Sequence, residues 1–178
     1  RYLLELSKQA NARSIVTDKM PRNFLYIPLI CAAFPEAKIV HVQRNAEATC
    51  WSNFKHYFAS KDLGYSYNLA DTVRYYKLYE QLMQYWYESF EHRIYSLDYD
   101  TLTERQEPET RRLIKYLGLN WENICLAPQK NMRPVSTASQ IQVRKKIYTG
   151  SSKAWRKYES FLNDAFKNLK YNPRQSNI

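Results

Sequence analysis

Short apolar runs alternate along the chain with longer segments whose apolar side chains recur at helical spacing. The runs at 13–18, 38–42 and 93–99 predict three strands, because each is short, rich in β-branched residues and bounded by polar ones. Helical patterns cover 1–11, 23–34, 45–58, 71–90, 108–121 and 151–170. This order favours an α/β fold in which a parallel sheet is flanked by helices on both faces. Three strands make a thin sheet, so a further strand is expected before residue 1.

Cap residues indicate where several of these helices begin and end. Asn23 is predicted to cap the helix over 23–34, and Pro35 follows its end. Gly118 is predicted to cap the carboxyl end of the helix over 108–121. Ser151 or Ser152 is the expected amino-terminal cap of the last helix. Residues 63–68 are predicted to form a loop.

The longest helix is rich in tyrosine. Leu78, Leu82, Tyr85 and Trp86 share one face by helical spacing and are the expected buried side. Aromatic residues at such spacing usually pack in a core, and we favour that interpretation over a stacking platform for bases.

Composition narrows the class of protein. The chain has 178 residues, which fits one domain over 1–178, and its formal charge of +10 favours an anionic partner. That partner could be a nucleic acid or a phosphorylated small molecule, although basic residues can also simply solvate a surface. No apolar stretch is long enough for a membrane span. The chain starts without Met, so we expect it to be part of something longer.

The cysteines do not indicate a metal site. Cys31, Cys50 and Cys125 are widely spaced and form no metal-ligand cluster with the histidines. They are expected to be reduced, mostly buried thiols.

Candidate chemistry gathers where the predicted strands end. In open parallel sheets, ligands bind outside the carboxyl ends of the strands. Lys19 lies at the end of the first strand, Arg44 at the end of the second and Tyr99 at the end of the third. Asp18 precedes Lys19, and Asp98 precedes Tyr99. Lys19, Arg44 and Tyr99 are therefore expected to converge on one rim of the sheet.

Arg44 and Ser52 together suggest a phosphate site. Arg44 stands at the start of a helix, where backbone amides and the helix dipole favour an anion. Ser52 lies two helical turns further on, where its hydroxyl could reach the same phosphate. The chain has no glycine-rich phosphate loop. The long basic loop over 126–148 is another segment expected to be functional.

Five segments of the chain resemble PAPS-dependent sulfotransferases, and they occur in the order expected for that family. They are "DKMPRNFLYIPLICAAFPEAKIVHVQRNAEATCWSNF", "YSLDYDTL", "RRLIKYLGLNW", "RPVSTASQIQVRKKIY" and "SSKAWRKYESFL". The similarity covers nearly the whole chain. It is closest to the branch that contains tyrosylprotein sulfotransferases and bacterial enzymes often fused to tetratricopeptide repeats, which would lie upstream of this chain. The resemblance implies a fold similar to nucleotide kinases and transfer of a sulfuryl group from 3′-phosphoadenosine 5′-phosphosulfate to an acceptor, without a metal.

The resemblance also implies roles for individual residues. Arg44 and Ser52 match the motif that holds the 3′-phosphate of the donor, and Lys19 matches a lysine implicated in catalysis. The other implied nucleotide contacts are Tyr99, Ser139, Gln142, Arg144 and Lys153. A fixed ammonium at Lys19 is physically suited to stabilise charge on the transferring group and the leaving phosphate.

Two departures from the family pattern matter. His56 stands where the tyrosylprotein branch has an arginine, which weakens one donor contact or makes it pH-dependent. The family's first strand, its 5′-phosphosulfate loop and the glutamate base lie upstream of the matching segments. The chain is thus expected to be a partial domain, and alone to transfer little or nothing.

Several alternatives stay open at this point. The chain could be a catalytically inactive scaffold that keeps the nucleotide half of a sulfotransferase, or a nucleotide kinase relative with its Walker A loop upstream. We disfavour a nucleic-acid-binding module, because the tyrosines fall at core spacing. The acceptor is expected to be the hydroxyl of a protein tyrosine or of a small molecule. A bacterial relative would be cytoplasmic, which we favour, whereas a tyrosylprotein enzyme would be in the Golgi lumen.

Overall fold

A computed structural model describes residues 15–58, 61–132, 142–162, 164–167 and 169. The chain divides into two compact units, Arg1–Ala37 and Lys38–Ile178. The helix expected over 1–11 lies outside the described residues.

The described part of the first unit, residues 15–37, contains one short helical segment. A 3-10 helix, η1 (Asn23–Tyr26), leads into helix α2 (Ile27–Ala33), with Pro28 in its first turn and Pro35 beyond its end. Asn23 is not the cap that was predicted, since its side-chain amide donates to Asp18 Oδ2 at 3.4 Å instead. Residues 15–18 are not a strand, which corrects the prediction for 13–18. A β-branched run becomes a strand only where a neighbour completes its hydrogen bonds, and none does so within the described residues.

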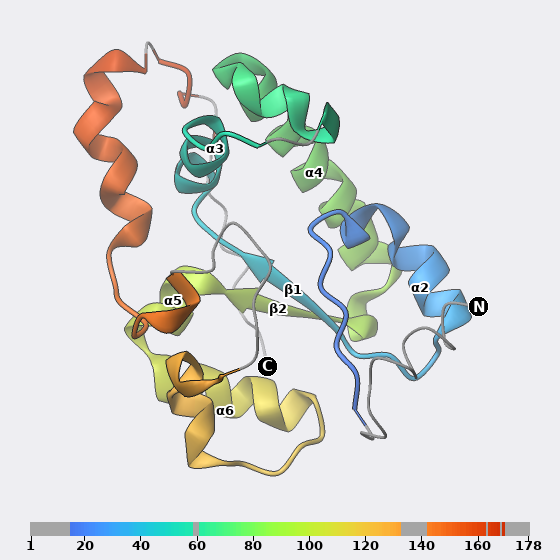
Figure 1. The fold of residues 1–178 in the computed structure, drawn as a ribbon. Coiled ribbons are helices and arrows are strands. Elements are labelled where there is room, and N and C mark those ends of the chain that lie inside the picture. Colours follow the sequence, from blue (N-terminus) through green and yellow to red (C-terminus); the bar gives the residue numbers. More distant parts are fainter. Residues whose placement is uncertain (1–14, 59–60, 133–141, 163, 168, 170–178) are drawn as a thin grey trace. The chain divides into compact units, whose positions relative to one another are not determined.

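The second unit is built on a parallel pair of strands. Strand β1 (Ile39–Gln43) pairs with β2 (Ile94–Asp98), so that His41 lies opposite Ser96 and Gln43 opposite Asp98. Two strands are found among the described residues, where three were predicted. The mixed α/β character and the parallel sheet among helices are as expected, and Figure 1 shows β1 leading into α3 and β2 into α5.

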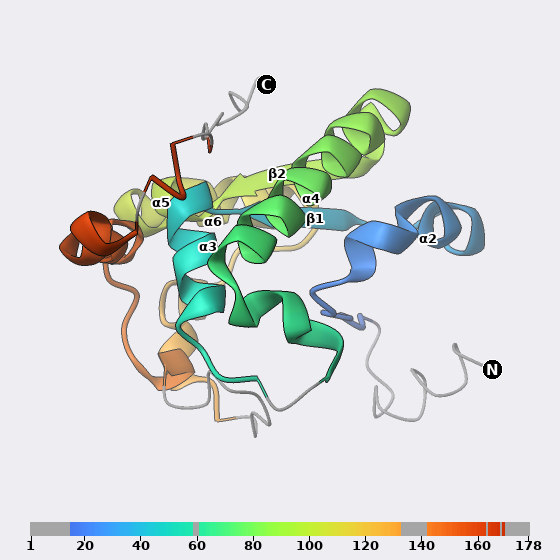
Figure 2. The same cartoon turned by 90° about the horizontal axis from the view of Figure 1, so that it is seen from above.

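Helices cover both faces of this small sheet. Helix α4 (Leu69–Ser89) and helix α6 (Gln106–Tyr116) lie on opposite sides of the strands in Figure 1. On the α6 side, Tyr116 donates towards the carbonyls of Ile39 and Arg93 and stacks on Tyr95. Helix α3 (Ala46–Phe54) lies beside α4 in both views (Figures 1 and 2). Among the described residues, the apolar core joins α3 and α4 to the segment after η7 and contains Ala46, Cys50, Val73, Leu162, Phe166 and Leu169.

The buried face of α4 differs from the predicted one. Leu78 and Tyr85 are more than half exposed, whereas Thr72, Val73 and Met83 are buried. The cause is a polar network that the apolar pattern does not reveal. His41 lies between the hydroxyls of Tyr79 at 2.5 Å and Tyr87 at 2.7 Å, which turns this tyrosine face towards β1. Tyr79 and Tyr87 therefore pack within the fold, as predicted for the tyrosines of this helix, whereas Tyr85 does not.

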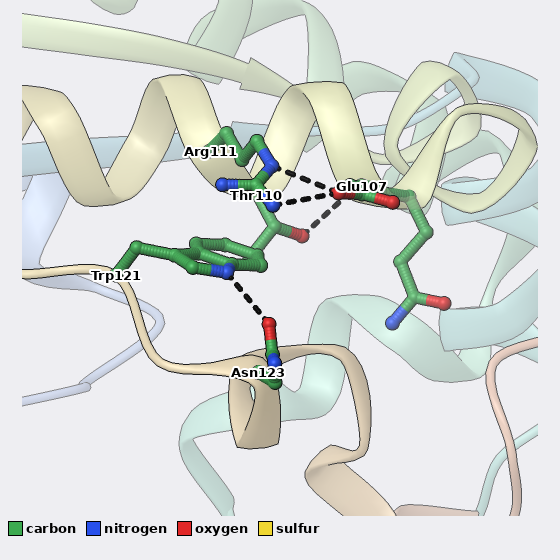
Figure 3. A network of polar contacts seen from close by, with 6 residues as sticks. Glu107, Thr110, Arg111, Trp121 and Asn123 are labelled. Carbon is green, nitrogen blue, oxygen red and sulfur yellow. Dashed lines mark hydrogen bonds and ion pairs between the residues drawn. The ribbon is translucent and has the colours of Figure 1, made fainter.

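Helix α6 ends as the sequence predicts. Its last residue, Tyr116, is followed by Gly118 with a φ of 71°, the left-handed conformation typical of a carboxyl-terminal glycine cap. A polar network joins α6 to the following 3-10 helix η4 (Asn123–Leu126). Arg111 bonds Glu107 at 2.8 Å and lies 4.0 Å from the ring centre of Trp121, whose Nε1 donates to Asn123 (Figure 3).

Two further segments depart from expectation. Residues 63–67 of the loop predicted over 63–68 belong to the 3-10 helix η2 (Lys61–Tyr67), and Asn68 caps α4. The helix predicted over 151–170 is the 3-10 helix η7 (Ser151–Phe161), which ends well before residue 170, and its cap is Gly150, not Ser151 or Ser152. The remaining short elements are α5 (Tyr99–Glu104), η3 (Glu91–Arg93), η5 (Pro128–Lys130) and η6 (Gln142–Arg144).

Candidate anion-binding site

The turns after the two strands are tied to each other. Asn45 caps α3, since its Oδ1 accepts a hydrogen bond from Ala48 N at 2.8 Å. Its own backbone N–H donates to Oδ2 of Asp100, in the first turn of α5, at 3.2 Å. Asp98 caps α5 in the same way, accepting from Thr101 N at 2.7 Å. These capped turns bring the residues that follow the two strands to one end of the sheet.

Arg44 is held at this end by three contacts. Its Nε donates to Ser152 Oγ at 2.9 Å and its Nη2 to Ser151 Oγ at 3.3 Å. Its guanidinium carbon lies 5.3 Å from the ring centre of Tyr99, within the range of a cation–π interaction. The side chain is half-buried. Arg44 is therefore oriented by residues from β2–α5 and from η7.

A cavity of about 460 Å³ opens beside Arg44. Helix α3 forms one wall, and the loop leading into η7 with the first turns of η7 forms the other. The lining residues are Arg44, Ala48, Trp51, Ser52, Lys55, Tyr99, Tyr148, Thr149, Gly150, Ser151, Lys153, Ala154 and Lys157.

The charge of this cavity is uniformly positive. Arg44, Lys55, Lys153 and Lys157 line it, and the lining set contains neither Asp nor Glu. Hydroxyls of serine, threonine and tyrosine complete the polar surface. Cations and hydroxyl donors around an open cavity are suited to bind phosphate or sulfate groups.

Four of the predicted site residues meet in this cavity. Arg44, Ser52, Tyr99 and Lys153 all line it, as their positions after strands and at the start of the last helix implied. Their role in binding a nucleotide stays a prediction until a ligand is bound.

The other predicted residues are placed differently. Lys19 is exposed and belongs to the first unit, so its convergence with Arg44 and Tyr99 stays a prediction. Ser139 lies outside the described residues, and Gln142 opens η6. Arg144 is exposed and is not one of the lining residues.

Sequence reasoning missed several residues of the cavity, of which Lys55, Lys157 and Trp51 have the largest side chains. Lys157 follows Lys153 by four residues, and Lys55 follows Ser52 by three, spacings that could have placed both beside predicted site residues. Trp51 precedes Ser52, and nothing in its sequence context separates it from a core residue. His56, expected to replace a family arginine, is exposed beyond the end of α3 and is not one of the lining residues, whereas Lys55 is.

The cysteines are free thiols, as predicted. Cys31 and Cys50 are buried and Cys125 is partly so. Burial raises the pKa of Cys50 to about 12, with smaller contributions from Glu80 and Glu47, so this thiol is not a nucleophile near neutral pH. Among the described residues, no three His, Cys, Asp or Glu side chains group as a metal site would require. Within the same residues, every helix falls short of the length and apolarity that crossing a membrane needs.

Gly150 shapes the cavity wall at the start of η7. Its φ of 81° is left-handed, so Gly150→Ala is expected to destabilise the fold by about 1 kcal/mol. Gly64→Ala is the matched control, since no atoms crowd a Cβ at either glycine and only Gly150 has a positive φ. Urea unfolding of the two variants measures the difference. Equal stabilities would contradict the left-handed turn.

Comparisons with known proteins identify a family for this chain. Residues 1–123 match the model of the sulfotransferase family. An uncharacterised protein of Aquifex aeolicus (strain VF5) is 38% identical over 163 residues, which is 90% of this chain. The chain spans about a fifth, 21%, of the length of that relative.

Proposed function

The chain belongs to the sulfotransferase family, and from that premise we propose that its cationic cavity binds the 3′-phosphate end of 3′-phosphoadenosine 5′-phosphosulfate. The observation that carries the proposal is the meeting of Arg44, Ser52 and Lys153 around one cavity without an acidic lining residue. The guanidinium and ammonium groups would neutralise the phosphate, and the hydroxyl of Ser52 would donate to one of its oxygens. Tyr99, which faces Arg44, would contact the nucleotide from the side of β2.

The proposed reaction is sulfuryl transfer to a hydroxyl. The acceptor oxygen forms a bond to sulfur while the bond between sulfur and the 5′-phosphate oxygen breaks, and the hydroxyl proton passes to a base. The leaving group, 3′-phosphoadenosine 5′-phosphate, departs with the bonding electron pair. Lys19 is proposed to stabilise charge that develops on the transferred group and the leaving phosphate.

The acceptor is proposed to be a tyrosine of a protein or peptide, or a hydroxyl of a small molecule. Incubation of the protein with 3′-phosphoadenosine 5′-phosphosulfate, and separately with an acidic tyrosine peptide or a simple phenol, distinguishes these acceptors. Formation of 3′-phosphoadenosine 5′-phosphate together with a sulfated acceptor supports an active enzyme. Nucleotide binding without transfer supports the proposed nucleotide site but not transfer by these 178 residues alone, and no binding contradicts the proposal.

Lys55 is proposed to supply the second cation that the resemblance places at His56. We expect Lys55→Ala to weaken binding of 3′-phosphoadenosine 5′-phosphate about fivefold, because an exposed ammonium contributes about 1 kcal/mol to binding an anion. His56→Ala is the matched control, one residue away, and is expected to change the affinity by less than about twofold, within the usual scatter of surface substitutions. Calorimetric titration at a fixed salt concentration measures both. A larger loss for His56→Ala than for Lys55→Ala would contradict this assignment.

A further inference from the structure

Ser152 is a buried hydroxyl at the edge of the cavity whose partner is Arg44. Only 9% of the residue is exposed, and its Oγ accepts from Arg44 Nε at 2.9 Å across 108 positions of sequence. The sequence predicted a helix cap here, but no side-chain cap is formed at this end of η7. The Ser152 hydroxyl instead accepts a hydrogen bond from Arg44, which lines the cationic cavity.

We propose that Ser152 is a positioning residue that fixes the guanidinium of Arg44 for a ribose phosphate, an inference that rests on the proposed function. A guanidinium offers two edges that can each form a pair of parallel hydrogen bonds. The edge formed by Nε and Nη2 is directed at Ser152 and Ser151. The edge formed by Nη1 and Nη2 is therefore the one that Arg44 presents to a phosphate.

Tyr99 restricts the same group from another direction. Its ring centre lies 5.3 Å from the guanidinium carbon, so a cation–π contact adds to the two hydrogen bonds that hold the group. An arginine that is fixed before the ligand arrives loses less side-chain freedom on binding. Ser152 thus raises the affinity for the 3′-phosphate without touching the nucleotide. Because Ser152 belongs to η7, the orientation of Arg44 depends on the position of that helix.

A thermodynamic cycle separates positioning from a structural role. The ligands are 3′-phosphoadenosine 5′-phosphate and adenosine 5′-phosphate, which lacks the 3′-phosphate. We expect Ser152→Ala to weaken the first roughly 10- to 20-fold, near the low end of the range for one hydrogen bond to a charged group, and the second less than about twofold. In an Arg44→Ala background, Ser152→Ala is expected to add no further loss.

Controls distinguish this result from misfolding. Ser66→Ala removes another buried serine, whose hydroxyl donates to Leu63 O away from the cavity, and is expected to leave both affinities unchanged. Ser152→Thr keeps the hydroxyl and is expected to restore the ratio of the two affinities. Thermal unfolding of each variant reports any loss of the fold.

A second measurement needs no nucleotide. The NMR resonance of the Arg44 Nε–H is identified by its absence in Arg44→Lys. In the wild type this proton is expected to exchange slowly with solvent, because a hydrogen bond to Ser152 protects it. In Ser152→Ala we expect it to exchange at least about fivefold faster. Equal weakening of both nucleotides, additive losses in the cycle, or unchanged exchange overturns the inference. If 3′-phosphoadenosine 5′-phosphate binds and Ser152→Ala has no effect, only this inference fails. If the wild type does not bind it, the proposed function fails too.

Discussion

Arg44→Ala is expected to weaken binding of 3′-phosphoadenosine 5′-phosphate about 100-fold or more. Arg44 lines the cavity and is already oriented by Ser151, Ser152 and Tyr99. A bidentate pair of charge-assisted hydrogen bonds to a phosphate contributes about 3 kcal/mol or more, and each 1.4 kcal/mol is tenfold in affinity. Calorimetric titration of the wild type and the variant measures the loss.

The matched control is Arg74→Ala. Arg74 is an exposed arginine of α4 and is not one of the cavity's lining residues, so its removal lowers the net charge equally. Its expected effect on affinity is less than about threefold, from long-range electrostatics alone. Similar losses for the two variants would mean that net charge, and not the geometry around Arg44, attracts the nucleotide.

The second large effect concerns stability at low pH and centres on His41. Burial lowers the pKa of His41 from 6.5 to about 4, and both ring nitrogens face tyrosine hydroxyls, of Tyr79 and Tyr87. A neutral ring donates at one nitrogen and accepts at the other, whereas a protonated ring donates at both. The network over β1 therefore suits the neutral form.

The direction of the pH dependence follows from this lowered pKa. Between pH 6.5 and about 4 the unfolded chain binds a proton at His41 and the folded chain does not, so the free energy of unfolding falls as the pH is lowered. At 1.36 kcal/mol per pH unit, the loss through this window is about 3 kcal/mol, with no further loss from His41 below it. Urea unfolding from pH 7 to pH 4 measures the slope.

A non-titrating variant isolates the contribution of His41. Carboxyl groups also titrate in this range, and burial raises the pKa of Glu80, which acts in the opposite direction. His41→Gln retains a donor and an acceptor but does not titrate. Between pH 6.5 and about 4, its unfolding free energy is expected to fall by about 3 kcal/mol less than that of the wild type. His56→Gln, at an exposed position, is the control and should keep the slope of the wild type. A wild-type slope in His41→Gln would contradict the buried neutral ring.

The parts of the fold with local signals were predicted from sequence. Strands β1 and β2 are short apolar runs, the helix predicted over 45–58 is α3 (Ala46–Phe54), and Gly118 ends α6 where a left-handed residue is needed. Arg44, Ser52, Tyr99 and Lys153 were placed together, because the strand ends and the family resemblance pointed to one rim.

The features that were missed depend on partners distant in sequence. The prediction of which face of α4 is buried was wrong because the hydroxyls of Tyr79 and Tyr87 form hydrogen bonds with His41. The spacing of apolar residues contains no information about those hydrogen bonds. Ser152 was assigned to a cap because Arg44, its partner, is 108 positions away. The β-branched residues at 15–18 are typical of a strand, but a strand forms only where a neighbouring strand completes its hydrogen bonds.

A crystal structure of the protein with 3′-phosphoadenosine 5′-phosphate tests the central claim most directly. We predict that the 3′-phosphate lies in the cavity within hydrogen-bonding distance of Arg44 and Ser52, with Lys153 beside it and the Ser152 contact to Arg44 retained. A nucleotide bound elsewhere, or bound with its 3′-phosphate away from Arg44, would contradict the proposed donor site.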